Sequence, residues 1–211
     1  REGYPSEKIF ITGNTVIDAL QYAIQENYQF DLPLLNELDY EDKRIILLTS
    51  HRRENIGKPM ENIFSAVNDI VNEYEDVELV FPIHLNPKVR EIAYAKFNNN
   101  PKVHIIEPLD YEPFTNLMAK AHLIVTDSGG LQEEAPSLGK PVLVIREETE
   151  RPEGIEAGTA KLVGTNYDNV YKEIDLLLSN NEEYKKMANA VNPYGDGKAA
   201  ERIVNIINEN L

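Results

Sequence analysis

The sequence predicts an open, doubly wound parallel α/β sheet, and two features of its apolar segments indicate this class. Short apolar runs, such as residues 44–49 (RIILLT), alternate with longer segments in which apolar residues recur at helical spacing, as in Ile63, Val67 and Ile70. A nearly all-apolar run suits a strand that is buried on both faces of a parallel sheet. Strands that alternate with helices at this spacing form such sheets through right-handed crossovers.

The expected elements follow one another along the chain. We predict strands at residues 9–12, 44–49, 77–83, 103–106, 123–125, 141–145 and 160–163. We predict helices at residues 13–24, 59–74, from Pro87 onward, 128–138, 168–178, 182–191 and 198–210, while residues 116–121 lead into the strand that begins at residue 123. Residues 31–41 are expected to form a linker, 107–114 a loop or helix start, 146–154 a charged loop, and 192–197 a break between two helices.

Composition limits the class of protein and its partners. The 211 residues are 42% apolar, which is enough for one sizeable core or two small ones. A net charge of -15 argues against nucleic acid or an anionic membrane as the main partner. The absence of cysteine excludes disulfides, thiolate metal sites and cysteine nucleophiles. With no apolar run of about 20 residues and no visible signal peptide, we expect a cytoplasmic protein. Because the chain opens at Arg1 without a methionine, we expect a piece of a longer protein.

Unusual polar residues gather where predicted strands end. Ligands of doubly wound sheets bind beyond the carboxyl ends of the strands, so this edge is the expected functional site. The residues concerned are His51 to Arg53, His84, Asp127 to Gly130, and Arg146 to Arg151.

The turn at residues 127–130 (DSGG) suits a bound phosphate. Two glycines let a ligand approach the main chain, and Ser128 is a good N-cap for a helix whose first amides attract an anion. The alternative is an ordinary tight turn with a serine cap. Glu133 and Glu134 could compensate the helix dipole, or one could accept hydrogen bonds from a ribose diol. Phosphate donors beside a diol acceptor indicate a nucleotide diphosphate.

The basic residues of this edge each have two interpretations. His51, with Arg52 and Arg53, could be a solvated turn, but its place at the end of a central strand favours contact with a phosphate. His84 could contribute to the same site or cap the next helix. Arg151 could line the site or be occupied by surface ion pairs with neighbouring glutamates.

The sequence does not provide the residue patterns that several other kinds of functional site require. His104 and His122 fall at strand starts, opposite His51 and His84, so we predict no metal site. Ser128 lacks the elbow of a serine hydrolase, and neither a dinucleotide nor a P-loop glycine motif is present. We therefore predict no cofactor.

Five motifs together resemble one family. They are SHRREN at 50–55, PIHLNP at 82–87, DSGGLQEEAPSLGKPVLV at 127–144, TERPEGIEAGT at 149–159 and NPYGDG at 192–197. In this order they resemble the non-hydrolysing UDP-N-acetylglucosamine 2-epimerases, and the likeness runs from ITGNTVIDAL at 11–20 to the C-terminus.

The resemblance implies one Rossmann-like half of a GT-B-type two-domain fold. Residues 1–211 would be the C-terminal nucleotide-binding domain, with residues 1–30 as a hinge or linking segment, and the N-terminal domain would be absent. Ser128, Gly129 and Gly130 would bind the diphosphate together with His51, and Glu134 would take the ribose hydroxyls. The segment from Leu109 to Phe114 would frame uracil, and Arg151 would line the same site. Leu109 replaces an amide side chain of relatives, so only main-chain recognition is carried over there.

The resemblance also implies a reaction and partners. The family inverts C2 of the sugar by eliminating UDP and adding it back, and His51 could donate a proton to the departing oxygen. The carboxylates that move the C2 proton belong to the N-terminal domain, so we expect this chain to bind a UDP-sugar weakly and not to epimerise it. Arg52 and His84 would contact a second UDP-N-acetylglucosamine that acts as an allosteric activator. A homodimer and a role in polysaccharide synthesis are further expectations.

Three other functions compete with this interpretation. The chain could be the nucleotide-sugar half of a GT-B glycosyltransferase, which would need an acceptor sugar. It could belong to a hydrolysing epimerase, which would release UDP and N-acetylmannosamine. It could also be a non-catalytic binding module, which has no turnover to lose.

Overall fold

Six parallel strands form the single sheet of the computed structural model, which describes residues 3–97 and 100–210. Their spatial order is β3-β2-β1-β4-β5-β6, and every neighbouring pair is parallel. This confirms the predicted doubly wound, Rossmann-like class. The strands are β1 (Arg44–Thr49), β2 (Val77–Pro82), β3 (Val103–Ile106), β4 (Leu123–Thr126), β5 (Val142–Val144) and β6 (Ala160–Leu162).

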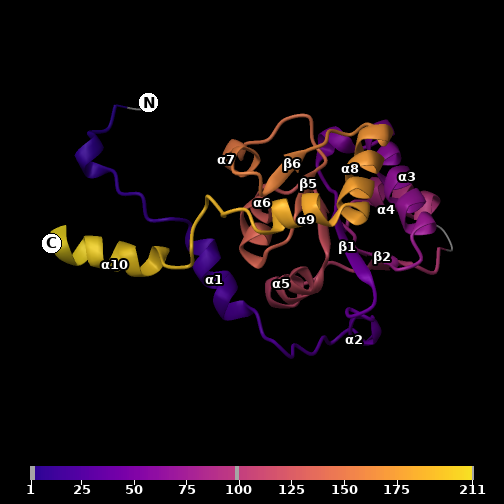
Figure 1. The fold of residues 1–211 in the computed structure, drawn as a ribbon, viewed down its shortest axis with the longest axis horizontal. Helices are drawn as coiled ribbons and strands as arrows, with labels where there is room; N and C mark the ends of the chain where they lie inside the picture. Colours follow the sequence, from indigo (N-terminus) through magenta and orange to yellow (C-terminus); the bar gives the residue numbers. More distant parts are fainter. Residues whose placement is uncertain (1–2, 98–99, 211) are drawn as a thin grey trace.

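Helices cover both faces of the sheet (Figure 1). Alternate residues of β1 enter two separate cores, Ile46 and Leu48 on one face and Ile45 and Leu47 on the other. The first face is covered by α3 (Lys58–Glu73), α4 (Pro87–Phe97) and α8 (Tyr167–Ser179). The second is covered by α1 (Thr15–Ala23), α2 (Pro33–Glu37), α5 (Tyr111–Lys120) and α6 (Gly129–Glu134). The chain therefore builds two cores rather than one.

The chain reverses its direction of winding between β1 and β4. From β1 it proceeds outward through β2 to β3, then returns beside β1 with β4 and proceeds to β6. Thr49 and Thr126 are partners in the register at the carboxyl ends of these two strands, and their hydroxyl oxygens lie 2.6 Å apart. The segments that follow β1 and β4 therefore begin side by side, at the switch point where such folds bind ligands.

Most predicted elements agree with the structure, but the strand at residues 9–12 is wrong. This segment follows the short 3-10 helix η1 (Ser6–Lys8), has no regular secondary structure, and leaves Ile11 96% exposed. It lies away from the sheet, so no strand is available to pair with it (Figure 1). The segment predicted to be a linker contains α2. The segment predicted to be a charged loop, residues 146–154, runs into α7 (Pro152–Glu156). Residues 1–2 of the predicted linking segment lie outside the described residues.

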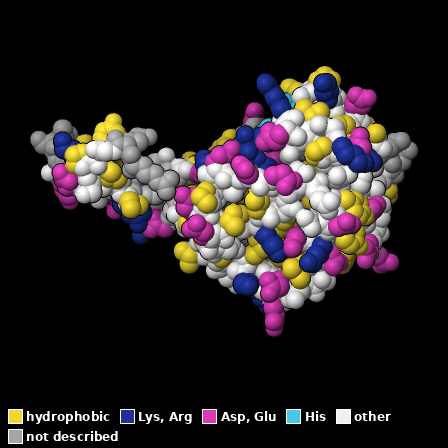
Figure 2. Space-filling view, turned by 90° about the horizontal axis from the view of Figure 1, so that it is seen from above, with side chains coloured by type: hydrophobic (Ala, Val, Ile, Leu, Met, Phe, Trp, Pro, Cys, Tyr) yellow, Lys and Arg dark blue, Asp and Glu magenta, His cyan; other side chains and the backbone are white. Residues whose placement is uncertain are grey.

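The N-terminal segment and α10 (Ala199–Asn210) project from the body as an arm (Figures 1 and 2). Asp18 of α1 holds the base of α10, because its carboxylate accepts from the amides of Ala199 at 3.1 Å and Ala200 at 2.8 Å. Between α8 and the arm lies α9 (Asn181–Ala188). Acidic and basic side chains are interspersed over the face of the body seen in Figure 2. None of the helices in the described ranges has the length and apolar character that a membrane span requires.

His122, which precedes β4, is expected to make folding depend on pH. Its ring stacks on Tyr184 with centroids 4.2 Å apart, and burial, then repulsion by Arg44 and Lys140, lowers the pKa of His122 from 6.5 to about 4. As the pH falls, the unfolded chain therefore binds a proton at His122 before the folded chain does. Neutral His122 contributes fully to the stability of the fold above pH 6.5, and this contribution is lost as the pH falls toward 4. Between pH 7.5 and 5, the free energy of unfolding should fall by about 2 kcal/mol more in the original chain than in His122→Phe.

Urea unfolding of both chains at the two pH values measures this difference. Phenylalanine keeps an aromatic ring against Tyr184 but cannot titrate. An equal loss of stability in the two chains would show that His122 does not cause the dependence.

Candidate functional site

A cavity of about 250 Å³ opens at the carboxyl ends of β1 and β4. It brings together His51, Leu109, Phe114 and Ser128, which were all predicted to bind one ligand, and His84, which was predicted to bind a second. The cavity is lined by Thr49, Ser50, His51, Pro82, His84, Pro108, Leu109, Phe114, Ser128 and Leu131. The lining thus combines polar groups of the strand ends with apolar side chains, among them the Phe114 ring.

The first turn of α6 is open at the edge of this cavity. Ser128 occupies the predicted N-cap position, but in the described part of the chain no side chain caps the first amides of the helix. The Ser128 amide donates instead to Thr126 Oγ1 at 2.9 Å. A Cβ atom at Gly129 would meet no other atom within 4 Å, so the main chain there is accessible from outside. An anion can approach such a helix start closely.

Glu134 lies at the other end of α6 and folds back over its start. A Cβ atom at Gly130 would stand 3.5 Å from Glu134 Oε1, so this carboxylate lies above the glycine turn. Burial raises the pKa of Glu134; a hydrogen bond to Tyr111 lowers it, and repulsion by Glu133 raises it further. Burial also raises the pKa of Tyr111 to about 12, with smaller contributions from Glu134. The Glu134 carboxylate is thus an acceptor near the open amides, and it is held by a hydrogen bond from Tyr111.

Arg151 does not pair with the glutamates of its own loop. Its Nε donates to Glu133 of α6, whose carboxylate also accepts from Asn14 at the start of α1. Neither Asn14 nor Glu133 was predicted to hold this arginine. Two of these neighbouring glutamates are engaged elsewhere, since Glu150 pairs with Arg146 and Glu147 accepts from Thr165. Arg151 is absent from the lining of the cavity described above.

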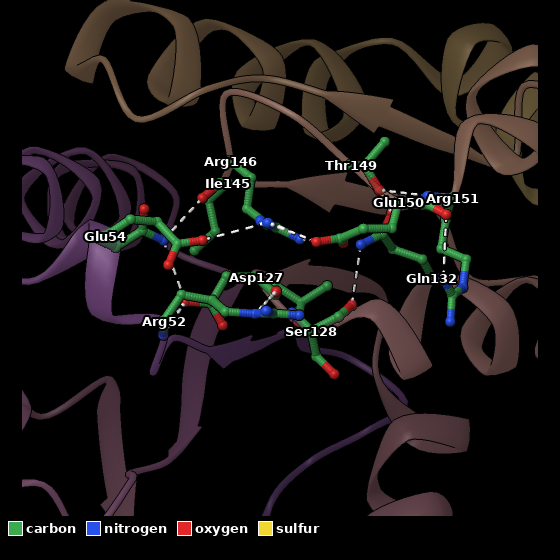
Figure 3. Close-up of polar contacts among 12 residues, drawn as sticks. Arg52, Glu54, Asp127, Ser128, Gln132, Ile145, Arg146, Thr149, Glu150 and Arg151 are labelled. Carbon is green, nitrogen blue, oxygen red and sulfur yellow. Dashed lines mark hydrogen bonds and ion pairs between the residues drawn. The ribbon is translucent and has the colours of Figure 1, made fainter.

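Arg146 reaches between two acidic side chains above this site (Figure 3). Its guanidinium lies 2.5 Å from Glu150 and 3.3 Å from Glu54, and only 11% of its side chain is exposed. Below it, Arg52 donates from Nε to the main-chain oxygen of Asp127 at 3.2 Å. Arg52 and Arg146 are therefore held by partners, and local ion pairs balance the charge of Arg146.

The histidines divide between the two edges of the sheet, as predicted. The rings of His51 and His84 stack at the cavity, with centroids 5.6 Å apart and planes at 17°. His84 Nδ1 also accepts from the amide of Asn86, so this histidine shapes the turn before α4 as well as lining the cavity. At the opposite edge, His104 Nε2 lies 2.7 Å from a carboxylate oxygen of Glu78, and His122 stacks on Tyr184.

Asp127 joins the two strand ends, a role that the sequence did not predict. Its side chain is fully buried, and Oδ2 accepts from the amides of His51 and Arg52, both at 2.8 Å, and from Ser50 Oγ and Asn55 Nδ2 at 3.3 and 3.2 Å. Nδ1 of His51 lies 3.2 Å from the other oxygen, Oδ1. The only available signal in the sequence was an acidic residue directly after a fully buried strand.

Known proteins with this fold carry similar sequences. The UDP-N-acetylglucosamine 2-epimerase family matches residues 1–208. A UDP-N-acetylglucosamine 2-epimerase of Bacillus subtilis is 56% identical over 204 residues, which are 97% of this chain and 53% of the relative. The structure of S. aureus MnaA with UDP is 53% identical, with a TM-score of 0.91 over 98% of this chain and 55% of that one. A UDP-GlcNAc 2-epimerase from Neisseria meningitidis bound to UDP-GlcNAc is 43% identical, with a TM-score of 0.89 over 99% of this chain and 57% of that one.

The sheet and its cavity define a Rossmann-like domain of the GT-B type, like those of its structural neighbours. More particularly, the chain belongs to the UDP-N-acetylglucosamine 2-epimerase family. It spans about half the length of the curated relatives that it matches.

Proposed function

We propose that this chain supplies the UDP-binding half of an enzyme that interconverts UDP-N-acetylglucosamine and UDP-N-acetylmannosamine. One observation carries the proposal: His51 and Ser128 line a single cavity at the switch point of the sheet, beside the open first turn of α6. Such a helix start favours an anion, and an imidazole adds a donor from the neighbouring strand. Membership of the epimerase family supports the choice of a UDP-sugar.

Each part of the nucleotide has a proposed partner. The amides of Gly129 and Gly130, with Ser128 and His51, bind the diphosphate. Glu134 accepts from the ribose hydroxyls, because its buried carboxylate lies over the glycine turn. Uracil lies against the main chain at Leu109 and the Phe114 ring, and Arg151 borders the site. For a second, activating UDP-sugar, the proposed contacts are Arg52 and His84.

The proposed reaction breaks the bond between C1 of the sugar and the diphosphate oxygen. UDP leaves with the bonding electrons while a base removes the C2 proton, and UDP then returns as the proton is restored to the opposite face of C2. Donors fixed around the diphosphate stabilise its growing negative charge, and His51 donates a proton to the departing oxygen. We assign the carboxylates that move the C2 proton to an N-terminal domain outside this chain, joined to it through residues 1–30. The homodimer predicted for the whole enzyme is part of this proposal.

The test compares the full-length parent with the 211-residue chain. Each is incubated with UDP-N-acetylglucosamine, and NMR follows the configuration at C2. We expect epimerisation by the parent only, and weak UDP binding by the isolated chain. Free UDP with N-acetylmannosamine would indicate a hydrolysing epimerase, and consumption only with an acceptor sugar would indicate a glycosyltransferase. Turnover by the isolated chain would contradict the assigned division of labour.

A further inference from the structure

The two oxygens of Asp127 have different surroundings. Oδ2 accepts from four donors of the segment after β1, namely Ser50 Oγ, the amides of His51 and Arg52, and Asn55 Nδ2. Oδ1 is buried and has no aligned hydrogen-bond donor among the described residues. The nearby Nδ1 of His51, 3.2 Å away, can become that donor through a small rotation of its ring. One oxygen is thus saturated by the loop, and the other faces the imidazole.

We propose that Asp127 is a positioning residue that fixes the His51 imidazole with its proton on Nδ1 and directs Nε2 toward the cavity. The catalytic consequence depends on the proposed function, in which His51 protonates the departing diphosphate oxygen. For this step Nε2 first takes up a proton, which makes the ring an imidazolium whose Nδ1–H still faces Asp127, and the Nε2 proton then passes to the oxygen as the bond to C1 breaks. In histidines generally, the hydrogen bond made by one ring nitrogen determines the proton on the other. A buried carboxylate can only accept, so the nitrogen that faces it must carry a proton.

The surroundings donate hydrogen bonds to this carboxylate and hold His51 in place. Two amides and two side-chain donors stabilise the charge on Oδ2, and Arg146 lies close enough to Asp127 to interact with its charge. Figure 3 shows Arg52 on the other side of Asp127, bound to its main-chain oxygen. The His84 ring stacks against His51, which limits rotation of the imidazole. Nδ1 faces the buried carboxylate, whereas 39% of the His51 side chain is exposed and lines the cavity.

The substitution Asp127→Asn distinguishes two roles of Asp127: positioning the His51 ring, and only supporting the loop after β1. The four donors around Oδ2 require an oxygen there, so the amide oxygen of asparagine takes that place. Its NH₂ group must then face His51 Nδ1, which has to accept instead of donate. The neutral ring is forced into the opposite tautomer, with its proton on Nε2. This ring is a poor acid, because losing that proton would leave an imidazolate and the amide NH₂ group opposes a second proton on Nδ1. The loop-supporting bonds are retained in this variant.

Nitrogen-15 NMR of the histidine rings in the full-length protein reads the tautomer directly, with His51→Gln used to assign the signals. We expect the Nδ1–H form in the original protein and the Nε2–H form in Asp127→Asn. The comparison variant is Asn55→Ala, which removes a donor to Oδ2 but leaves Oδ1 beside the ring, so it should keep the Nδ1–H form. An Nε2–H ring in the original protein overturns the proposal, even if Asp127→Asn does not fold. An unchanged tautomer in a folded Asp127→Asn also overturns it.

Turnover provides the second measurement. We expect Asp127→Asn to lower kcat by about 100-fold, within the range of a misplaced general acid, while KM changes by less than about 3-fold. A residue that only supported the loop would affect KM and kcat together, as Asn55→Ala should. If the tautomer changes but kcat does not, His51 is not the proton donor, and the proposed function fails while the positioning of the ring stands.

Discussion

Replacing His51 with asparagine in the full-length protein is expected to lower turnover about 1,000-fold and to weaken UDP binding by less than about 10-fold. Asparagine retains a polar donor toward the cavity, so part of the proposed diphosphate contact should survive. It cannot deliver a proton to the departing oxygen. Steady-state assays of C2 epimerisation give kcat, and isothermal titration with UDP gives the affinity.

The matched control for this change is His104→Gln. His104 lies at the opposite edge of the sheet and contacts Glu78, so its replacement should leave turnover within about 2-fold. Full turnover by the His51 variant would show that the imidazole takes no part in the chemical step. A loss of UDP binding as large as the loss of turnover would indicate that His51 only binds the nucleotide.

Replacing Gly129 with valine is expected to weaken UDP binding by at least about 100-fold without unfolding the protein. A Cβ atom at this position meets nothing within 4 Å beyond its chain neighbours and the main chain of its own helix, and valine forms a helix more readily than glycine. The side chain instead occupies the space through which, in the proposed function, a diphosphate reaches the amides of α6. Titration calorimetry with UDP and urea unfolding measure the two effects separately.

Ala200→Val is the control for this substitution. Ala200 is an exposed small residue in the first turn of α10, on the arm, so valine there should change neither UDP affinity nor turnover. Unchanged UDP affinity in the Gly129 variant would locate the diphosphate away from the start of α6. Loss of the unfolding transition would mean that the space around Gly129 is needed by the fold itself.

The sheet was predictable because its pattern is local. Residues 44–49 are apolar almost throughout, and a strand buried on both faces requires that composition. Residues 9–12 have the same local character, but a strand also needs a neighbour, and the winding of the chain provides none there. The sequence alone cannot distinguish these cases, since pairing depends on where the whole chain passes.

The edge of the sheet that holds the site was predictable for a similar reason. Each strand end contributed a polar residue, and the switch-point rule required His51 and Ser128 to meet. The partners of these residues were not predictable. Glu133 accepts from Arg151, 18 positions away in the chain, and Asp127 accepts from the amide of His51, 76 positions away. Such contacts depend on the relative depth and direction of side chains, which composition and spacing do not specify.

The pairing of Glu133 with Arg151 has a consequence for how an anion reaches this acidic protein. The charges of these two groups offset each other locally, so a ligand close to the protein meets short-range donors and little uncompensated charge from this pair. Farther away, the ligand meets the field of the entire body, whose net charge is -15. Dissolved salt weakens that distant repulsion more than contacts inside the pocket. Nucleotide capture should therefore become faster as ionic strength rises, the reverse of the behaviour of proteins that guide their anionic ligands electrostatically.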